Sequence, residues 1–519
     1  MEGSATIVSN AVAATAIVEE DAPYGREPHP NRDSKERAGA APSVARLGQS
    51  LCSIVRSPLA ITHNNILKHA GYGPSMVKKR AARSIFLPLL CIALFALTIA
   101  VHGTFIWASL APLFVFFLGR ESWKRILAGA AAAALSWAAI AGYWTSSYSA
   151  LIFALVIIGV SLFLFLFLCT AAFMLRAFPP WLSLFSVPLA WIALQELFSH
   201  SVIDSYWASL AIFSPSLSPL LGIVGREGTT FLIILANVLF SFALSLPGDR
   251  MFRAMSALLV TALLSIAGFS YSLEPQGDPF TVALVQPNIQ RSWEWRMAHV
   301  ESDILPLLEN MTLSVAARNH PDVILWPEYA VPDDVFLRPH LAGRLGDLSR
   351  AANATLILGS LRWTGGSYSD SQPYKNDVVL AFSPQGELLS AYTASHPLPY
   401  EPQTLPAERM ELLTLGGEAI GASLCYEETQ KDVSRFHRAS GARYAVSLAN
   451  DLAFTRSSIG LRHSSLYSRL NAAESGMYVL RATNTGITQV INPYGKVVGQ
   501  LPSNSRGILV RTIYLPPAH

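Results

Sequence analysis

The sequence predicts a membrane protein in which a bundle of about seven transmembrane helices is followed by an α/β layered domain. Of the 519 residues, 51% are hydrophobic and only 14% are charged, which is too apolar for an ordinary soluble protein. Long apolar runs fill residues 84–272. After Leu273 the pattern changes to short β-branched strands that alternate with helical stretches, which is typical of an α/β domain. The net charge of +3 is small and gives no reason to expect a nucleic-acid partner.

Residues 1–80 form the first predicted segment, a disordered N-terminal tail. They are rich in Ala, Ser, Pro and charged residues and show no sustained hydrophobic periodicity. Met1 to Glu20 lacks the basic start and the long apolar core of a secretory signal. The tail ends in a basic cluster, Lys78-Lys79-Arg80, just before the first apolar run.

Residues 81–272 form the predicted transmembrane bundle. Most of their apolar runs approach or exceed the roughly 20 residues that cross the hydrocarbon core of a bilayer. The runs lie near 84–101, 104–119, 126–145, 149–176, 180–198, 228–247 and 251–271. The segment 207–222 is interrupted by prolines, and we expect it to be re-entrant or interfacial.

Basic residues predict the orientation of these spans, because short cytoplasmic loops carry an excess of Lys and Arg. With seven spans, the basic residues at 78–83 and 120–125, together with Arg176, Arg250 and Arg253, all fall on one side, which is predicted to be cytoplasmic. Arg226 is the exception. An odd number of spans then places residues 273–519 on the opposite side, the periplasmic one in a cell inner membrane.

Residues 273–519 form the predicted α/β domain. Helices are expected at 300–318 and 461–475, and two of the strands are expected to form a hairpin around Pro384-Gln385-Gly386. The expected strands are Phe280–Gln286, Val323–Trp326, Thr355–Leu361, Val378–Phe382, Glu387–Tyr392, Ala419–Cys425, Tyr444–Ala449 and Ile487–Ile491. Arg435, His437 and Arg438 are expected on a solvated face, with contact to a lipid headgroup as the alternative.

Cys425 is the candidate nucleophile. The four cysteines show no paired spacing, so neither a disulfide framework nor a metal site is indicated, and Cys425 is the one that lies in the α/β domain. It ends an apolar strand, and a cysteine reacts as the thiolate, which requires a nearby base. Glu328 ends another strand behind Trp326 and Pro327. Those apolar neighbours should desolvate the carboxylate and raise its pKa toward the range of a general base.

Several motifs together resemble the nitrilase (carbon–nitrogen hydrolase) superfamily. They are Trp326-Pro327-Glu328, Cys425-Tyr426-Glu427, Ala449-Asn450-Asp451, His463 and Arg481-Ala482-Thr483-Asn484-Thr485-Gly486. With the N-terminal bundle, the chain resembles the apolipoprotein N-acyltransferase family over roughly residues 84–510. The resemblance implies an αββα sandwich with a Glu-Lys-Cys triad, in which Cys425 is the nucleophile and Glu328 the general base.

The resemblance also implies partners and supporting residues. It implies acyl transfer from a phospholipid donor to the N-terminal amine of a diacylglyceryl-modified apolipoprotein, through a thioester and without a cofactor. It implies that Tyr426 and Glu427 support the nucleophile and that Trp295 is functionally important.

Three positions depart from the family pattern. The lysine of the triad falls on Ala394, within Tyr392-Thr393-Ala394-Ser395-His396. A donor that stabilises an oxyanion in this way is worth about 3–4 kcal/mol. Glu401 stands one residue away from the expected glutamate, and Asn471 replaces a usual arginine. Lys375 and His396 flank the open end of the predicted hairpin, so either of them could supply the missing positive charge, whereas the alternative for Lys375 is that it points into solvent.

Three interpretations of the function remain open at the level of the sequence. The first is a membrane-bound N-acyltransferase, impaired by Ala394. The second is a membrane-tethered amidase or hydrolase that uses water as the acceptor. The third is a non-catalytic relative that binds lipid or lipoprotein.

Overall fold

The computed structural model describes residues 74–517, apart from 120, 148, 200–208, 247, 365–373, 400 and 455–456. Most of the tail that the sequence predicts to be disordered lies outside the described residues. Helix α3 begins at Pro74, ahead of the predicted boundary at residue 80.

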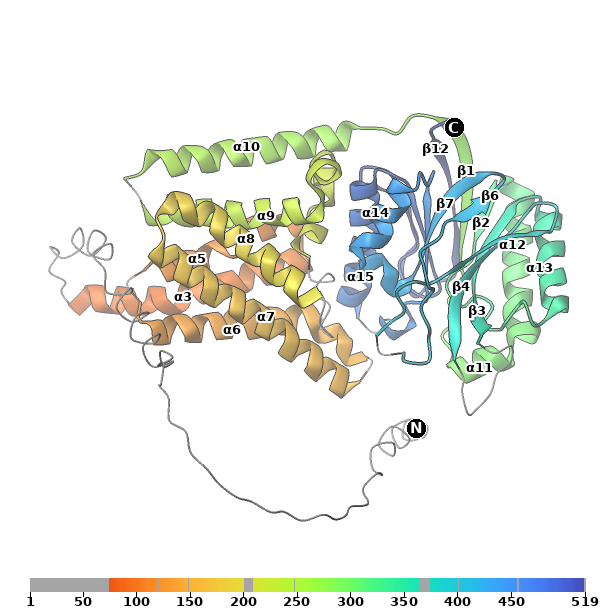
Figure 1. Ribbon diagram of the computed structural model, residues 1–519, viewed down its shortest axis with the longest axis horizontal. Helices are drawn as coiled ribbons and strands as arrows, with labels where there is room; N and C mark the ends of the chain where they lie inside the picture. Colours follow the sequence, from red (N-terminus) through yellow and green to blue (C-terminus); the bar gives the residue numbers. More distant parts are fainter. Residues whose placement is uncertain are drawn as a thin grey trace, which may run out of the picture. The chain divides into compact units, whose positions relative to one another are not determined.

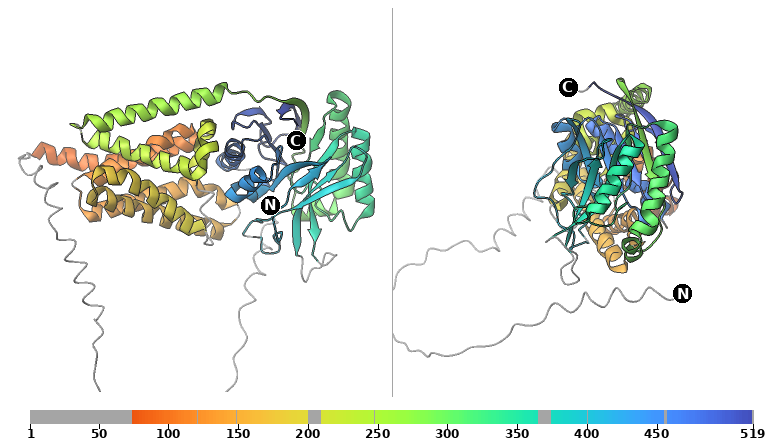
Figure 2. Two further views of the ribbon diagram at one scale, coloured as in Figure 1. Left: turned by 45° about the horizontal axis from the view of Figure 1, so that its top comes forward. Right: turned by 90° about the vertical axis from the view of Figure 1, so that its right-hand side faces the viewer.

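The N-terminal half is helical, and its long helices run alongside one another (Figures 1 and 2). Within the described residues, five helical segments are long and apolar enough to cross a membrane, and two shorter apolar segments, Ile85–Ala100 and Gly103–Leu118, precede them. All seven coincide with predicted runs, but the number that crosses a bilayer remains a prediction. The α-helices are α3 (Pro74–Ala100), α4 (Ile106–Ser109), α5 (Ala111–Leu118), α6 (Trp123–Gly142), α7 (Ala150–Ala177), α8 (Pro180–Ser199), α9 (Ser218–Ser245) and α10 (Arg250–Ser272).

The buried polar side chain of Asn237 has its hydrogen-bond partners within the helical bundle. Asn237 of α9 accepts hydrogen bonds at Oδ1 from the backbone amides of Leu110 and Ala111, at 2.7 and 2.9 Å. These amides begin α5 and have no partner inside that helix. Because hydrocarbon offers no alternative hydrogen bonds, this contact stabilises the packing of α9 on α5.

Helix α9 contains a break at Gly225, where φ is +68°. The segment predicted to be re-entrant corresponds to two short 3₁₀ turns, η5 (Leu210–Phe213) and η6 (Pro215–Leu217), and to the first turn of α9. The longer part of α9 begins at Arg226, close to the predicted start of the sixth span.

The C-terminal half contains two six-stranded sheets. The strands of one sheet lie in the order β12-β1-β2-β3-β4-β5 and those of the other in the order β11-β10-β9-β8-β7-β6. The first six strands along the chain are β1 (Asp278–Gln286), β2 (Val323–Leu325), β3 (Thr355–Trp363), β4 (Lys375–Phe382), β5 (Leu388–Thr393) and β6 (Leu413–Leu415). The remaining six are β7 (Glu418–Leu424), β8 (Ala445–Ala449), β9 (Val479–Thr483), β10 (Gln489–Ile491), β11 (Val497–Gln500) and β12 (Gly507–Leu515).

Alternation along the strands places each sheet between two apolar layers. In β1, Val282 and Leu284 belong to the core between the sheets, whereas Ala283 and Val285 face the helices. Helices α12 (Leu305–Asn319) and α13 (Pro339–Ala352) cover one sheet, and α14 (Lys431–Ala439) and α15 (Ser458–Ser475) cover the other (Figure 1). The remaining helical turns are α11 (Trp293–Ala298), the π-helical turn η7 (Val300–Ile304), η8 (Cys425–Thr429) and η9 (Leu452–Phe454). The predicted αββα sandwich is confirmed.

Candidate active site

Cys425 lies where strand β7 ends. The buried strand β7 pairs in parallel with β8, and Cys425 opens the 3₁₀ turn η8 directly after Leu424. Its φ is +47°, a left-handed conformation that non-glycine residues rarely adopt. Such strain is typical of functional positions, where the surrounding structure holds it in place.

Cys425 and Glu328 line one cavity of about 120 Å³. The cavity walls come from both sheets and from the loops that follow β2, β5, β7 and β8. The lining residues are Glu328, Tyr329, Asp377, Ala394, His396, Pro397, Leu398, Glu401, Leu424, Cys425, Tyr426, Asn450, Asp451, Leu452, Ala453 and Phe454. The nucleophile and the base predicted from the sequence are therefore brought together.

Glu328 is held in a desolvated position after β2. Trp326 is completely buried, and its indole Nε1 donates to Thr312 Oγ1 at 2.9 Å. The backbone amide of Asn450 donates to Glu328 Oε2 at 2.9 Å. A Cβ on Gly359 would lie 2.6 Å from the Glu328 Cα, so the glycine lets β3 approach this loop.

Electrostatics favour the protonated forms of both Glu328 and Cys425. Burial raises the pKa of Glu328 well above its usual value, and the neighbouring carboxylates of Asp377 and Glu401 raise it further. Burial likewise raises the pKa of the Cys425 thiol, with Glu328 and Asp451 as the next causes. The predicted direction of the Glu328 shift is confirmed, although acidic neighbours contribute as well as the apolar ones.

Ala394 is buried and lines the cavity, and its amide donates to the carbonyl of Asp377 at 2.9 Å. The predicted hairpin is present, with β4 and β5 antiparallel. Lys375, the first residue of β4, is only 7% exposed, which rules out the alternative that it points into solvent.

The ammonium of Lys375 is fully engaged with residues around the cavity. Its Nζ donates to Tyr329 Oη and Asp377 Oδ1, both at 2.6 Å, and to Thr404 Oγ1 at 3.0 Å. It also lies 3.9 Å from Glu401 Oε2. Lys375 therefore stands behind the cavity wall, where its charge is shared with Asp377 and lowers the pKa of Glu328.

Glu427 joins the loop that contains Ala394 to the turn that begins with the nucleophile Cys425. Its Oε1 accepts from Tyr392 Oη at 2.7 Å and from the backbone amide of Ser395 at 2.7 Å. Its Oε2 accepts from the amide of Leu424 at 2.8 Å. This arrangement agrees with a supporting role for Glu427.

The other sequence-predicted residues have mixed outcomes. Tyr426, Glu401 and His396 line the cavity, and His396 Nε2 lies 3.1 Å from Asp432 Oδ2. Trp295 is not brought to this cavity: it stacks on His299 with ring centroids 4.2 Å apart and lines a separate surface pocket.

The sequence did not predict an ion-pair cluster near Cys425, although Arg481 and Asp451 lie within the motifs and Glu428 directly follows one of them. Arg481 is completely buried in β9 and pairs with Asp451 Oδ2 at 3.0 Å and with Glu428 Oε1 at 3.2 Å. A charged residue inside an otherwise apolar strand is the signal that could have identified this cluster. A Cβ on Gly486 would lie 1.9 Å from Asp451 Oδ2, so this glycine makes room for it.

The expectation of a solvated face for Arg435, His437 and Arg438 is wrong for His437. His437 is buried, and its Nε2 lies 3.0 Å from the carbonyl oxygen of Ala422 in β7. Helix α14 packs directly against β7, and the imidazole lies in that contact.

Sequence comparisons show which known proteins this chain is similar to. The model of the carbon–nitrogen hydrolase family matches residues 281–517. An apolipoprotein N-acyltransferase of Geobacter metallireducens is 30% identical over 355 residues, which cover 63% of this chain and 67% of that protein. One of Pseudomonas aeruginosa is 28% identical over 346 residues, which cover 62% of this chain and 65% of that protein.

Two solved structures align with less than half of the chain. Nit3 of Saccharomyces cerevisiae, a nitrilase-superfamily member, is 15% identical with a TM-score of 0.37, covering 46% of this chain and 90% of its own. An amidase from Nesterenkonia sp. is 17% identical with a TM-score of 0.36, covering 47% of this chain and 93% of its own.

The α/β half thus has a carbon–nitrogen hydrolase domain, with a cysteine and a glutamate at the carboxyl ends of strands from two facing sheets. The chain as a whole belongs to the apolipoprotein N-acyltransferase family. The alignments span about two thirds of the length of those relatives.

Proposed function

We propose that this protein is a membrane-bound N-acyltransferase that acts through a thioester on Cys425. The acyl donor is a phospholipid, and the acceptor is the N-terminal cysteine amine of a diacylglyceryl-modified apolipoprotein. The observation that carries the proposal is that Cys425 and Glu328 share a cavity whose wall contacts the helical half. Phe454 of that wall packs edge-on against Trp144, with ring centroids 4.9 Å apart.

In the first half-reaction, Glu328 accepts the thiol proton of Cys425, and the sulfur attacks the ester carbonyl of the phospholipid. The tetrahedral intermediate collapses when the bond to the glycerol oxygen breaks. Protonated Glu328 returns the proton to that oxygen, which leaves a lysophospholipid and an acyl thioester.

In the second half-reaction, the neutral amine of the acceptor attacks the thioester carbonyl. The carbon–sulfur bond breaks, an amide forms, and the proton lost by the amine returns to Cys425 through Glu328. The lysophospholipid leaves before the amine reacts with the acyl thioester, so the kinetics should be ping-pong.

The oxyanion of the tetrahedral intermediate needs a positive charge nearby, and Ala394 supplies none. We assign this role first to Lys375, which Asp377 holds behind the cavity wall. His396, on the wall itself, is the second candidate.

We further propose that the protein lies in the cell inner membrane with residues 273–519 on the periplasmic side. The distribution of basic residues supports this orientation. Arg226, the one basic residue that does not follow this distribution, is buried in protein contacts and does not lie in a solvated loop. It therefore does not count against the proposed orientation.

The functional test is complementation of a strain depleted of its own N-acyltransferase. Restored growth, and lipoproteins with a third acyl chain, are expected for the wild type but not for Cys425→Ser. Folded protein in the membrane without complementation would count against the proposal.

A non-catalytic role is the second candidate, favoured by Ala394 together with the acidic neighbours that raise the pKa of Cys425. An amidase would release free fatty acid or ammonia without an amine acceptor. Acyl transfer that depends on the acceptor amine would exclude both alternatives.

A further inference from the structure

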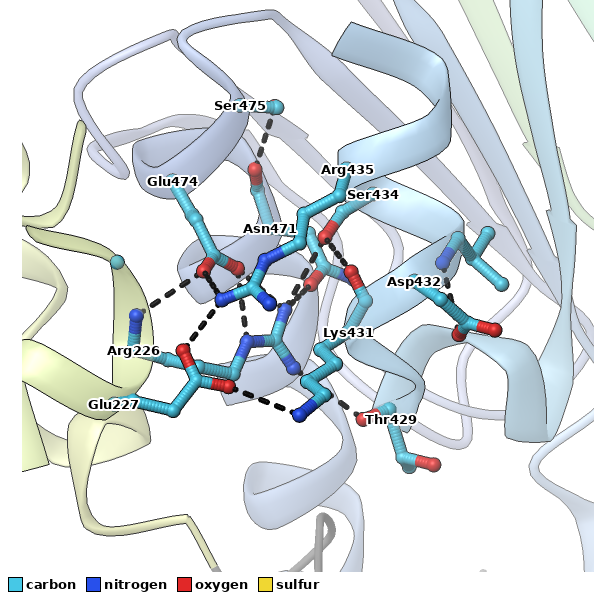
Figure 3. A network of polar contacts seen from close by, with 12 residues as sticks. Arg226, Glu227, Thr429, Lys431, Asp432, Ser434, Arg435, Asn471, Glu474 and Ser475 are labelled. Atoms are coloured by element: carbon cyan, nitrogen blue, oxygen red, sulfur yellow. Dashed lines mark hydrogen bonds and ion pairs between the residues drawn. The ribbon is translucent and has the colours of Figure 1, made fainter. Parts of the chain in front are cut away.

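The membrane-like helix α9 contacts the nucleophile turn η8 through one buried arginine, Arg226. Figure 3 shows Arg226 reaching from α9 between α14, α15 and the end of η8. The residue is completely buried, and Glu474 of α15 is its carboxylate partner, with Nη2 and Oε2 2.7 Å apart. A buried arginine with a dedicated carboxylate is costly unless its remaining N–H groups are also bonded.

The break at Gly225 makes this contact possible. Its φ of +68° ends the first part of α9, so the backbone amide of Arg226 is free to donate to Glu474 Oε1, at 3.1 Å. The Nε of Arg226 donates to Glu474 Oε2 at 2.8 Å. The carboxylate thus binds both the helix amide and the guanidinium. A Cβ on Gly225 would lie 3.3 Å from Glu474 Oε1. Glycine therefore suits this position both for its positive φ and for the close approach of Glu474.

The other N–H groups of Arg226 reach the nucleophile turn. Nη1 donates to the carbonyl of Thr429, the last residue of η8, at 3.4 Å. Nη2 donates to Asn471 Oδ1 at 2.9 Å, and the Nδ2 of Asn471 in turn donates to the carbonyl of Glu428 at 2.9 Å. Two consecutive carbonyls at the end of η8 are therefore held, directly or through one side chain, by Arg226.

Cys425 opens the same five-residue turn, in a strained left-handed conformation. Such a conformation persists only where the surrounding structure restrains it. Glu427 restrains the start of the turn through the amide of Leu424, and Arg226 restrains its end. We propose that Arg226 is a positioning residue for Cys425, through which the membrane-like helices hold the nucleophile turn in its reactive conformation. The reactive role of Cys425 belongs to the proposed function, so the test must separate the two.

The test uses the full-length protein in lipid nanodiscs and compares Arg226→Gln, Asn471→Leu and Arg462→Gln with the wild type. Arg462→Gln is the matched control, because Arg462 also joins α15 to a membrane-like helix, at the carbonyl of Ala100, but does not touch η8. Asn471→Leu releases the carbonyl of Glu428 without removing the buried charge, so it serves if Arg226→Gln does not fold.

Hydrogen–deuterium exchange of the peptide containing residues 425–430 is the first measurement, because it requires no activity. Loss of charge-assisted hydrogen bonds should accelerate its exchange about tenfold in Arg226→Gln and Asn471→Leu. Exchange of β8 should stay at the wild-type rate, and Arg462→Gln should leave the turn unchanged. Unchanged exchange at 425–430 in both test variants, or equal acceleration in Arg462→Gln, would overturn the inference even if the protein is not an acyltransferase.

The second measurement is the rate of thioester formation on Cys425 with phospholipid. Arg226→Gln should lower the maximal rate about tenfold or more while the KM for the lipid changes less than about twofold, since the turn and not the lipid contact is altered. Arg226→Lys, which keeps one charged contact, should be intermediate. A loss confined to KM would contradict a positioning role. A wild-type protein that forms no thioester would refute the proposed function alone and leave the exchange result to decide the inference.

Discussion

Ionisation of Cys425 is opposed on several sides. The thiol is desolvated, and Glu328, Asp451, Glu428 and Glu401 all disfavour a thiolate. Two buried cations around the site, Lys375 and Arg481, already pair with carboxylates. At the residue scale, burial and the acidic neighbours therefore favour a neutral thiol at Cys425, and its proton must move to a base during the reaction.

Ala394→Lys should lower the pKa of both Cys425 and Glu328, because it places a cation in the cavity wall opposite them. We expect acyl transfer to increase about tenfold or more, part of what an oxyanion donor supplies. The pH dependence of Cys425 alkylation by iodoacetamide, with the other cysteines replaced by serine, measures the pKa directly. Ala394→Met is the control for size. An alkylation profile that does not move would show that residue 394 lies too far from the sulfur.

Lys375→Met should destabilise the protein by about 3–5 kcal/mol, because Asp377 is left as a buried, uncompensated charge. Lys375→Met combined with Asp377→Asn should recover most of that stability, as measured by chemical denaturation. If Lys375 also supplies the field for the oxyanion, the double variant will be stable but slow. A double variant with full activity would limit Lys375 to a structural role.

At the scale of single elements, the contact between α14 and β7 is organised around His437. A Cβ on Gly421 of β7 would lie 2.7 Å from the imidazole, so the glycine makes room for the ring beside the strand. Burial lowers the pKa of His437 to about 4. The imidazole is therefore neutral in the folded protein across the physiological range.

This shift makes the stability of the fold dependent on pH. In the unfolded chain the imidazole titrates near its usual pKa of about 6.5, so the stabilisation is complete above that pH. It is lost progressively as pH falls from about 6.5 through 4, by up to about 3 kcal/mol. His437→Gln should remove that dependence, which denaturation at a series of pH values would reveal. An identical pH dependence in the variant would mean that His437 is not the responsible group.

Elements and site differ in how far the sequence predicts them. Strands with apolar alternation, such as β1, and the hairpin of β4 and β5 are predictable because their periodicity is local. Strand β9 has the charged Arg481 at its centre, which interrupts the apolar run by which a buried strand is recognised in the sequence. The burial of His437, and the pairing of Lys375 with Asp377, depend on packing between elements far apart in the chain, which no local pattern encodes.

At the scale of the whole molecule, the helical and α/β halves share polar contacts at several points. Beyond Arg226, Lys431 pairs with Glu196 at 2.9 Å, and Ser457 Oγ lies 3.0 Å from Tyr143 Oη. These contacts place α14 and α15 against the helices, the side from which the proposed lipid substrates would enter. A site held this way suits two substrates that are anchored in the bilayer by their acyl chains.

The proposed topology predicts that residues 273–519 face away from the cytoplasm. A cysteine introduced at exposed Arg409 should react with a membrane-impermeant maleimide in intact spheroplasts, in a chain whose native cysteines are serine. A cysteine at the exposed Lys124, in the first turn of α6, should react only after lysis. The reverse pattern would invert the orientation and with it the periplasmic location.

Acyl transfer from a phospholipid to Cys425 is tested most directly by mass spectrometry of the purified protein after incubation with a defined phospholipid. We expect a peptide containing Cys425 that carries the mass of one acyl chain of that lipid. Neutral hydroxylamine should release the chain, and an acceptor peptide with a lipid-modified N-terminal cysteine should remove it as an amide. The Cys425→Ser protein should stay unmodified. Wild-type protein that is folded in nanodiscs but carries no acyl chain on Cys425 under these conditions would show that Cys425 is not the acyl carrier.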